Sequence, residues 1–421
     1  MKILLCNYRF FVSGGPERYM FNLTDELNAQ GHETIPFSIK YNNNKYSSYE
    51  NYFVDPLGNR DEILYRDQRK TFKNIYRTAL RLFYDPEVER AVIRLINDTN
   101  PQIAYVLHYL RKLSPALLVG LKKMRIPIVV RLSDYGMVCP QMHCLRDDFP
   151  CDLCLEGDLL PSIKYRCVNH SLPLSIANAL ATSFHRWMKY FDLIDKYVVT
   201  NAFMYEMMVK AGFDSNRLEL IETFVNPPLN ISKVVIPGRI VYAGRIERIK
   251  GLHILLKAAR IIAEIAPALD WHIKVAGDGV DRVYLHEISE LSKHPAIVNR
   301  VELLGKLTIE DVYQLLSGAE VSVAPSLSYE NLPNSVLESF VCGAPVIASN
   351  IGSLACMIED GKSGFLVDPN DPDSLARAII IAMQHSGKLR SMGENAIKLG
   401  QGQYSHINHV YKLESLFRSL I

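Results

Sequence analysis

The chain has 421 residues, 48% of them hydrophobic, and a formal net charge of +2. This length and composition allow substantial buried cores and indicate two or three domains, while a nearly neutral charge gives no overall attraction to nucleic acid. No uninterrupted apolar stretch approaches the roughly 18 residues of a membrane span, and the first apolar run is too short for a secretory signal, so we expect a cytoplasmic protein.

The first predicted elements are a strand, a glycine turn and a helix. Residues 2–6 predict a buried strand, Gly14 and Gly15 a tight turn, and residues 16–30 a helix before the next strand at 34–37. This order is typical of a Rossmann-type unit, although the G-x-G-x-x-G sequence of dinucleotide sites is missing. We expect the N–H groups at Gly14 and Gly15 to approach a phosphate; a plain tight turn is the alternative.

Residues 64–84 combine many cations with apolar residues at helical spacing, and their only acid is Asp67. Such a helix suits an anionic membrane surface. The alternative is an amphipathic helix that packs on its own domain and leaves its cations in water. The cations are Arg66, Arg69, Lys70, Lys73, Arg77 and Arg81.

Asp134 follows a predicted buried strand at residues 128–132. At the end of a parallel strand, a carboxylate can orient a substrate hydroxyl, with Arg131 and His108 as candidate neighbours. The alternative is an aspartate that caps the turn after the strand. The other strands predicted in this half lie at 103–107, 196–200 and 218–222.

Most of the eight cysteines cluster in one part of the first half. In a cytoplasmic chain they do not indicate a disulfide framework. Cys151 and Cys154 have the C-x-x-C spacing of a zinc knuckle, and Cys139 with Cys144 or Cys167 would complete a tetrahedral thiolate set. Our candidate ligands for a structural zinc are Cys139, Cys151, Cys154 and Cys167. A redox pair and free thiols are the alternatives.

Asn226, Pro227 and Pro228 open the best candidate linker, because consecutive prolines fix φ and end any helix. Strand and helix patterns then alternate from Ile240 to about Gly400, and apolar residues at helical spacing predict a terminal helix. We therefore expect three parts. They are an N-terminal domain at 1–224 with a Cys-rich loop at 139–167, a C-terminal domain at 225–402 and a terminal helix at 403–421.

A glycine-bounded loop with two cations follows the strand predicted at 240–243. Arg245 and Lys250 lie between Gly244 and Gly251. A diphosphate carries about two negative charges, which Arg and Lys match, and glycine lets the backbone approach the anion. The loop therefore predicts a diphosphate site; ordinary surface charge is the alternative.

Two glutamates, Glu330 and Glu338, flank a turn and a helix start. We expect Asn334 to cap the helix after Pro333, which places Glu330 in the loop and Glu338 on the helix. N–H groups at a helix start suit a phosphate or a sugar, and a carboxylate accepts hydrogen bonds from vicinal hydroxyls. We assign Glu338 to a ribose and Glu330 to a hexose; a solvated loop acid and an ordinary helix acid are the alternative. The expected amide contacts come from Asn331, Leu332 and Asn334.

A series of short motifs occurs in a characteristic order along most of the chain. In the second half they are Gly244-Arg245 with Lys250-Gly251, Val275-Ala-Gly-Asp-Gly279, Leu304-Gly-Lys306, Ala324-Pro-Ser326, Glu330 with Glu338, Gly343-Ala-Pro-Val-Ile-Ala348 and Gly364-Phe-Leu-Val367, and Ser13-Gly-Gly-Pro-Glu17 precedes them in the first half. Their types and order resemble family-4 retaining glycosyltransferases of the GT-B fold. The cysteines resemble the subset of that family with a C-x-x-C insertion.

The resemblance implies an α/β protein with two Rossmann-like domains facing a central cleft and a C-terminal helix that crosses back to the N-terminal domain. The catalytic residues that it implies are Glu330, Asp134, Arg245 and Lys250. The implied donor-binding residues are Gly14, Gly15, Arg245, Lys250, Gly277, Lys306, Leu307, Glu330, Asn331, Leu332, Asn334 and Glu338. Arg245 and Lys250 would neutralise the leaving group, so no catalytic metal is required. Asp371 and Asp373 match a D-x-D metal motif, but helix capping explains them.

The sequence departs from the family at Ser133, where related enzymes usually place a histidine before the aspartate. Serine is no comparable base at neutral pH. In a retaining front-face displacement, the departing phosphate oxygen can accept the acceptor's proton. The departure therefore leaves the implied chemistry intact.

The resemblance implies a retaining hexosyltransferase that uses a UDP- or GDP-linked sugar and a glycan or lipid-linked acceptor, in cell-surface polysaccharide or glycoconjugate biosynthesis. We expect it in the cytoplasm, peripheral at the inner face of the membrane, with an anionic membrane surface as a candidate partner and with no nucleic acid. Two alternatives remain: a GT-B sugar-nucleotide epimerase, and a non-catalytic zinc-containing binding protein on the same fold.

Overall fold

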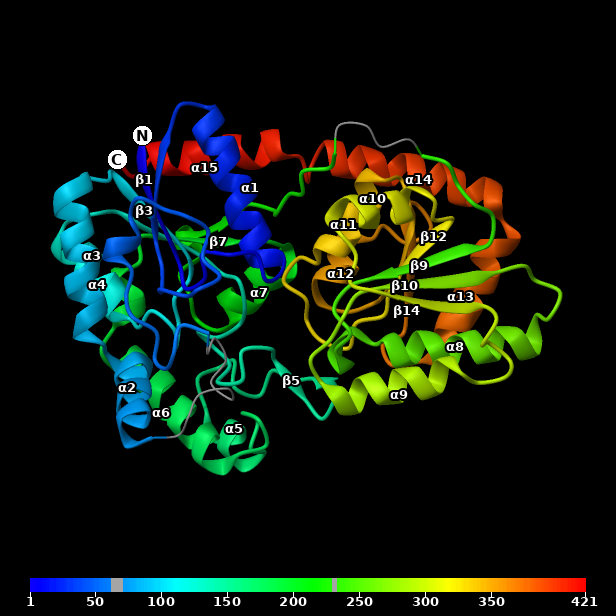
Figure 1. Cartoon of the computed structure of the whole chain (residues 1–421), viewed down its shortest axis with the longest axis horizontal. Coiled ribbons are helices and arrows are strands. Elements are labelled where there is room, and N and C mark those ends of the chain that lie inside the picture. Colours follow the sequence, from blue (N-terminus) through cyan, green and yellow to red (C-terminus); the bar gives the residue numbers. More distant parts are fainter. Residues whose placement is uncertain (62–70, 229–232) are drawn as a thin grey trace. The chain divides into compact units, whose positions relative to one another are not determined.

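The computed structural model describes residues 1–61, 71–228 and 233–421. Within these residues the chain divides into two compact units. Unit 1 comprises Met1–Cys144, Asp152–Ile221 and His409–Ile421, and unit 2 comprises Leu145–Cys151 and Glu222–Asn408. Figure 1 shows that each unit is built around a sheet with helices packed against it.

A six-stranded parallel sheet forms the centre of unit 1, in the order β2-β1-β3-β4-β7-β8. In β1, Leu4 pairs with Ile35 on one side and Ala104 on the other. Strands covered on both faces are nearly continuous apolar runs, which is why these segments could be predicted from the sequence. The strands are β1 (Lys2–Asn7), β2 (Glu33–Phe37), β3 (Ile103–His108), β4 (Ile128–Arg131), β7 (Lys196–Val199) and β8 (Leu218–Leu220).

The helices of unit 1 begin at residues that suit helix starts. In the first helix, Pro16 occupies the first turn and Glu17 lies near the positive end of the helix dipole. Asn201 and Asp85 accept hydrogen bonds from backbone N–H groups at the starts of two others. The helices are α1 (Gly15–Ala29), α2 (Phe72–Phe83), α3 (Pro86–Thr99), α4 (Ala116–Lys123), α5 (Leu160–Lys164), α6 (Leu172–Trp187) and α7 (Ala202–Lys210), with 3-10 turns η1 (Glu50–Tyr52), η3 (Tyr190–Leu193) and η4 (Ser215–Arg217).

Unit 2 has a second six-stranded parallel sheet, in the order β11-β10-β9-β12-β13-β14. Its core includes buried Trp271 and Tyr242 together with the apolar face of α8. The strands are β9 (Arg239–Ala243), β10 (His272–Ala276), β11 (Val301–Gly305), β12 (Val321–Ala324), β13 (Val346–Ser349) and β14 (Gly364–Val367). The helices are η5 (Arg248–Lys250), α8 (Leu252–Ile265), α9 (Arg282–Ser292), α10 (Ile309–Ser317), α11 (Asn334–Val341), α12 (Gly352–Met357), α13 (Pro372–Gln384) and α14 (Ser386–Gln401).

The last helix, α15 (His406–Arg418), carries the chain back into unit 1. The hydroxyl of Tyr19, in α1, lies 2.9 Å from His409 Nε2, and His32 Nε2 lies 2.5 Å from Glu414 Oε1. The rings of Tyr105 and Phe417 are 5.5 Å apart. These contacts attach the terminal helix to the sheet of unit 1, as the sequence resemblance implied.

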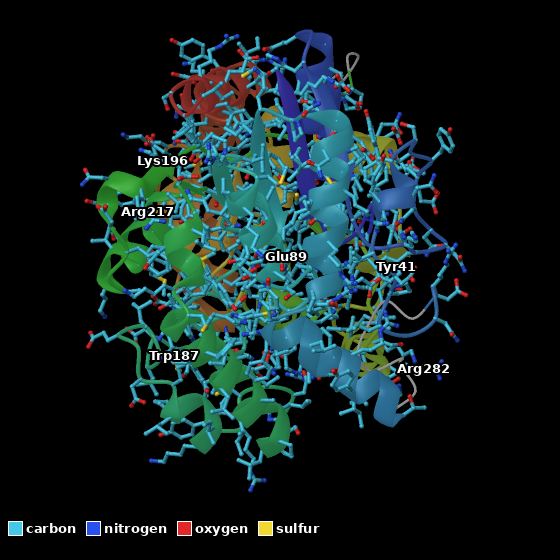
Figure 2. All side chains as sticks on the ribbon, turned by 90° about the vertical axis from the view of Figure 1, so that its left-hand side faces the viewer. Tyr41, Glu89, Trp187, Lys196, Arg217 and Arg282 are labelled. Atoms are coloured by element: carbon cyan, nitrogen blue, oxygen red, sulfur yellow. The ribbon has the colours of Figure 1, made fainter. Side chains whose placement is uncertain are left out.

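The short antiparallel hairpin of β5 (Leu145–Arg146) and β6 (Phe149–Pro150) falls within the Cys-rich loop. Figure 2 shows the side chains of unit 1 from another side, with Lys196 and Arg217 neighbours at the β7–β8 edge.

Among the described residues, no helix combines the length and the apolar character that crossing a bilayer requires.

The segment predicted as a membrane helix, residues 64–84, is described only from residue 71, so Arg66, Arg69 and Lys70 lie outside the described residues. One expectation for its cations is wrong. Arg81 is fully buried rather than solvated: it pairs with Asp85 and donates to the backbone oxygens of Lys112, at 3.0 Å, and Asp55, at 2.9 Å. A guanidinium with this many internal acceptors is held by the protein and is not available to lipid.

Candidate functional site

The strand ends β9, β10 and β11 of unit 2 are joined by close backbone contacts between glycines. Gly277 N–H donates to the Gly305 oxygen at 2.8 Å, and Gly244 N–H donates to the Ala276 oxygen at 3.0 Å. A Cβ on Gly277, whose φ is +153°, would lie only 1.8 Å from the Gly244 oxygen. Only glycine permits this approach, so the loops form an edge of exposed backbone without side chains in the way.

The loop after β9 is fixed in the same manner. Gly251 adopts a φ of +71°, and a Cβ there would lie 1.8 Å from the Pro325 oxygen. Leu327 N–H donates to the Ile249 oxygen at 2.8 Å. These contacts hold the loop after β9 against the loop after β12, which brings Lys250 and Glu330 together across eighty residues of sequence.

Lys250 and Glu330 form a close ion pair. Lys250 Nζ lies 2.6 Å from Glu330 Oε1 and 2.7 Å from Oε2, and the Ser326 hydroxyl donates to Oε1 at 2.8 Å. Burial opposes ionisation of Glu330, but the charge and hydrogen bonds of Lys250, with Ser326 and the charge of Arg245, lower the pKa of this carboxyl below its usual value. The site therefore contains a carboxylate that is ionised and held in place at neutral pH.

Arg245 lies on the outer side of the same loop. Its side chain is 58% exposed, and Nη1 lies 2.7 Å from Glu247 Oε1. An exposed ion pair of this kind contributes little stability and exchanges partners at small cost. The Arg245 side chain can therefore leave Glu247 and turn towards an anion. Lys250, which is bound to Glu330, would contact the same anion from the inner side of the loop.

Glu338 is buried on α11, with 3% of its surface exposed. The expectation that Asn334 caps this helix is wrong: α11 begins at Asn334, Pro333 takes the cap position in extended conformation, and no side chain caps the helix. Proline has no N–H, and its backbone oxygen accepts from Val336 N–H at 3.1 Å. The Leu332 side chain is buried in the core beneath the helix, so only the backbone amide of this residue, which is the contact expected from the sequence, is suited to a ligand.

Two other predicted donor contacts lie at the end of β11. Gly305 closes the strand with a φ of +70°, and the exposed Lys306 and half-buried Leu307 follow before Thr308, which caps α10. Asp371 also caps a helix: its Oδ1 accepts from Asp373 N–H at 2.9 Å and Ser374 N–H at 3.0 Å. The capping explanation for this D-x-D sequence is confirmed.

In unit 1, Gly14 and Gly15 mark the start of α1. Gly14 is extended, with a φ of −173°, and a Cβ there would meet nothing closer than 3.7 Å. The fold alone therefore does not require glycine at position 14. Beside the turn, the Ser13 hydroxyl accepts from Arg9 Nη1 at 2.6 Å and donates to Glu17 Oε2 at 2.9 Å.

Asp134 lies in a pocket at the ends of β3 and β4. His108 Nε2 lies 3.0 Å from Asp134 Oδ2, and Gly136 N–H donates to Oδ1 at 2.7 Å. Burial opposes ionisation, but the charge and hydrogen bond of His108, the Gly136 N–H and the charge of His143 outweigh it and lower the pKa of Asp134. His108 is a direct partner of this carboxylate, which the sequence could suggest only as a neighbour.

The Ser133 hydroxyl is hydrogen-bonded to a backbone oxygen and to Arg131. It donates to the Leu107 oxygen at 2.8 Å and accepts from Arg131 Nη1 at 2.9 Å. Ser133 thus ties β4 to β3. The imidazole beside Asp134 comes from the neighbouring strand, at His108, and not from the position before the aspartate.

The predicted zinc ligands do not converge in this structure. The residues described include no group of three or more His, Cys, Asp or Glu side chains placed to hold a metal ion. Instead, a hydrogen bond from Cys144 is the main cause that lowers the pKa of Cys139 to about 6, with backbone N–H groups of Cys144, Gln141 and Met142 adding to it. Zinc binding therefore stays a prediction.

A family profile matches part of unit 2, whereas solved structures resemble the whole chain. Residues 237–385 match the profile of the family described as "Glycosyl transferases group 1". We refer to this matched segment as the group 1 domain. We call the backbone at Gly244, Gly277 and Gly305 the glycine edge. The glycine edge, the Lys250–Glu330 pair and α11 all lie in the group 1 domain.

A longer alignment extends beyond the group 1 domain. The D-inositol 3-phosphate glycosyltransferase of Corynebacterium urealyticum is 27% identical over 289 residues, which span 62% of this chain and 66% of that protein, just under two thirds of its length.

Solved structures resemble the whole chain. HepE of Anabaena in complex with UDP matches with a TM-score of 0.67 at 15% identity, covering 100% of both chains. Sucrose-phosphate synthase of Thermosynechococcus elongatus matches with a TM-score of 0.69 at 18% identity, covering 100% of this chain and 98% of that one. Together with the two six-stranded parallel sheets, these likenesses establish the GT-B fold.

Proposed function

We propose that the protein is a retaining glycosyltransferase that transfers a hexose from a nucleoside-diphosphate sugar, UDP- or GDP-linked, to a glycan or lipid-linked acceptor. The observation that carries the proposal is the Lys250–Glu330 pair beside the glycine edge of the group 1 domain. It places a cation and an ionised carboxylate next to exposed backbone. The relative from Corynebacterium urealyticum is named as a glycosyltransferase, and HepE was solved with UDP and with UDP-glucose.

The diphosphate would bind to the loop after β9. Lys250 has three N–H donors, of which Glu330 accepts two, so one remains for a phosphate oxygen. Arg245 would exchange its exposed partner Glu247 for the other phosphate. The backbone at Gly277, Lys306 and Leu307 would receive the base. The proposal also assigns the helix start at Gly14 and Gly15 to the donor, because such N–H groups suit an anion.

The sugar end of the donor would be positioned by carboxylates. Glu338 would accept hydrogen bonds from the ribose hydroxyls, and Glu330, oriented by Lys250 and Ser326, would accept them from the hexose. The amides of Asn331, Leu332 and Asn334 would add backbone contacts. These groups hold the anomeric carbon in one orientation, which is the main contribution a protein makes to a transfer whose leaving group is already charged.

The acceptor hydroxyl would be oriented by Asp134. Its carboxylate stays ionised because His108 and Gly136 N–H stabilise the charge. In the transfer, the bond from the anomeric carbon to the phosphate oxygen breaks and the bond to the acceptor oxygen forms on the same face of the sugar. The acceptor's proton passes to the departing phosphate oxygen, and Lys250 and Arg245 stabilise the negative charge of the diphosphate.

We further propose that catalysis requires no metal and that the protein acts at the inner face of a membrane in cell-surface polysaccharide or glycoconjugate biosynthesis. Structural zinc is a separate proposal that metal analysis can decide. The group 1 domain and its catalytic geometry favour a transferase over an epimerase or a binding protein.

Release of free nucleoside diphosphate tests the proposal. Candidate UDP- and GDP-sugars should first be ranked by how far each raises the unfolding temperature, since a ligand that binds the native state stabilises it. With the best donor, nucleoside diphosphate should appear only after acceptor is added. Conversion of the donor into its epimer without acceptor would indicate an epimerase, and release of nucleoside diphosphate without acceptor would indicate hydrolysis. Binding with no release under any acceptor would indicate a non-catalytic binding protein.

A further inference from the structure

Helix α6 presents large apolar side chains to solvent. Leu180 is 55% exposed and Trp187 is 76% exposed, and Leu172 and Ile176 continue the same stripe at helical spacing. The fully buried residues of α6 are small or polar, namely Ser175, Ala179, Ala181, Thr182 and His185, and of its large apolar side chains Phe184 packs inward, on Phe83. A helix that only covered its own domain would place these two sets the other way round.

The neighbouring helices extend this apolar surface. Leu160 of α5 is 70% exposed, and Tyr165 follows that helix in an exposed position. Both α5 and α2 pack against α6, and Figure 1 shows the three helices gathered at one end of unit 1. We call the exposed side chains of α5 and α6 the α6 face. It consists of Leu160, Tyr165, Leu172, Ile176, Leu180 and Trp187.

Cations predominate around the α6 face, and the exposed acids Glu156, Asp158 and Asp192 lie before α5 and after α6. No Asp or Glu occurs between Asp158 and Asp192, and none occurs in α2. The cations Lys164, Arg166 and Lys189 are exposed at its borders. An apolar stripe bordered by cations complements a surface that is apolar inside and anionic outside, which describes a bilayer with acidic headgroups.

Arg186 contributes to the fold and not to this border. Its guanidinium donates to the Gly157 oxygen at 3.1 Å and to the Met137 oxygen at 3.3 Å. His185 also points inward, and burial lowers its pKa to about 4, so it stays neutral. The positive border is therefore carried by Lys164, Arg166 and Lys189, none of which belongs to the donor or acceptor residues.

We propose that the α6 face docks on an anionic membrane, with its apolar stripe in the headgroup region and its bordering cations on the phosphates. A tryptophan at the end of such a stripe suits this depth, because its ring is apolar and its N–H is polar. The inference deepens the proposed function, since it gives the enzyme access to a lipid-linked acceptor. It places the contact on α5 and α6, and α2 of the predicted basic segment also packs against α6.

Sedimentation of the full chain with vesicles tests this surface. Vesicles of equal parts phosphatidylglycerol and phosphatidylcholine should bind the protein at low salt, and pure phosphatidylcholine should bind it much less. The double change Ile176→Ser with Leu180→Ser should weaken binding about tenfold or more, because two apolar side chains no longer leave water. The matched control is Val280→Ser with Val283→Ser, which alters two exposed valines of unit 2, at 65% and 81% exposure.

The cations provide a second arm that leaves the apolar stripe intact. Changing Lys164, Arg166 and Lys189 together to Gln should release the protein from anionic vesicles. The same change at Lys293, Lys362 and Arg390, which are also exposed, should not. This arm decides the question even if the serine variant fails to fold.

Equal vesicle binding by all variants, or none by the unaltered protein, would overturn the proposal. Self-association that the serine change abolishes, without vesicle binding, would also overturn it and identify the face as a contact between copies of the chain. Transfer to a soluble acceptor is measured separately. Vesicle binding as expected without any transfer would refute the proposed function and leave the membrane surface standing.

Discussion

The carboxylates Glu330 in unit 2 and Asp134 in unit 1 each lie beyond the end of a parallel strand and next to a basic side chain, but they are held differently. Lys250 hydrogen-bonds to both carboxylate oxygens of Glu330, and Gly251 fixes the backbone of the loop that carries Lys250. Asp134 is paired with His108 through one oxygen and leads into a segment with several left-handed residues other than glycine. The first arrangement has a lysine ammonium on a fixed backbone, and the second has a histidine ring beside a less regular segment.

This difference suggests a division of labour. A site for a charged diphosphate needs a cation at every physiological pH. A rigid loop holds that cation in the position where the diphosphate binds. A site for an uncharged hydroxyl needs a well-oriented acceptor more than it needs charge. The family profile covers residues 237–385, which lie in unit 2, and includes no part of unit 1.

The largest expected effect belongs to the donor cation. Lys250→Ala should lower kcat/KM by about a hundredfold or more, because it removes a charged hydrogen bond worth about 1.5–3 kcal/mol and leaves Glu330 buried without its partner. Steady-state kinetics would measure this. Arg245→Ala should cost less, since its exposed side chain leaves no buried charge behind.

Lys274→Ala is the matched control, because Lys274 pairs with Glu302 in the middle of β10 and away from the glycine edge. It should retain nearly full activity. Wild-type kinetics in both the Lys250 and the Arg245 variants would remove the loop after β9 from the active site.

The second prediction concerns the acceptor pocket. Asp134→Asn should lower kcat about tenfold to a hundredfold, because the amide oxygen is a weaker acceptor for the substrate hydroxyl than a carboxylate. His108→Gln should have a smaller effect of the same kind, since it removes the partner and not the acceptor. Donor affinity, measured by calorimetry, should stay unchanged in both. Loss of donor binding in the Asp134 variant would contradict the division between the two halves.

The third prediction separates the two glutamates. Glu338→Gln should weaken binding of the free nucleoside diphosphate about tenfold, whereas Glu330→Gln should mainly reduce turnover and the discrimination between sugars. Calorimetry with the diphosphate and kinetics with two donor sugars would distinguish them. Identical profiles for the two variants would show that ribose and hexose are not assigned as we propose.

The smallest effect on activity is expected from the cysteines. With a pKa lowered to about 6, Cys139 should be largely thiolate at pH 7, and alkylation by iodoacetamide should slow as the pH falls through 6. If zinc binds as the sequence predicts, elemental analysis should find about one equivalent, Cys151→Ser should lower it, and chelation should speed alkylation of Cys139. A metal-free, fully active preparation would end the zinc hypothesis and leave the transferase proposal unaffected.

Much of the fold could be predicted because strands such as 2–6 and 103–107 are buried on both faces and are nearly all apolar. The loop after β9 can be recognised in the sequence because its glycines and cations lie within a few residues of one another. The pairing of Lys250 with Glu330 cannot, because both were expected to face the ligand and only the tertiary structure shows that one holds the other.

Other features depend on contacts that a sequence does not display. His108 reaches Asp134 from a neighbouring strand, and Asn334 loses the cap position because Pro333 is already extended. The sequence pattern indicates a surface cation at Arg81, but in the structure Asp85 and two backbone oxygens bind its guanidinium. On α6 the apolar spacing is visible in the sequence, but not the direction in which it faces.

Thermal unfolding with UDP and GDP tests the central claim, that the loop after β9 in the group 1 domain holds the nucleoside diphosphate, most directly. One of the two nucleotides should raise the unfolding temperature of the unaltered protein and of the Lys274→Ala control in a concentration-dependent manner. The Lys250→Ala variant should show little or no increase at the same concentrations. An equal increase in Lys250→Ala and in the control would contradict the account, because the diphosphate would then bind elsewhere.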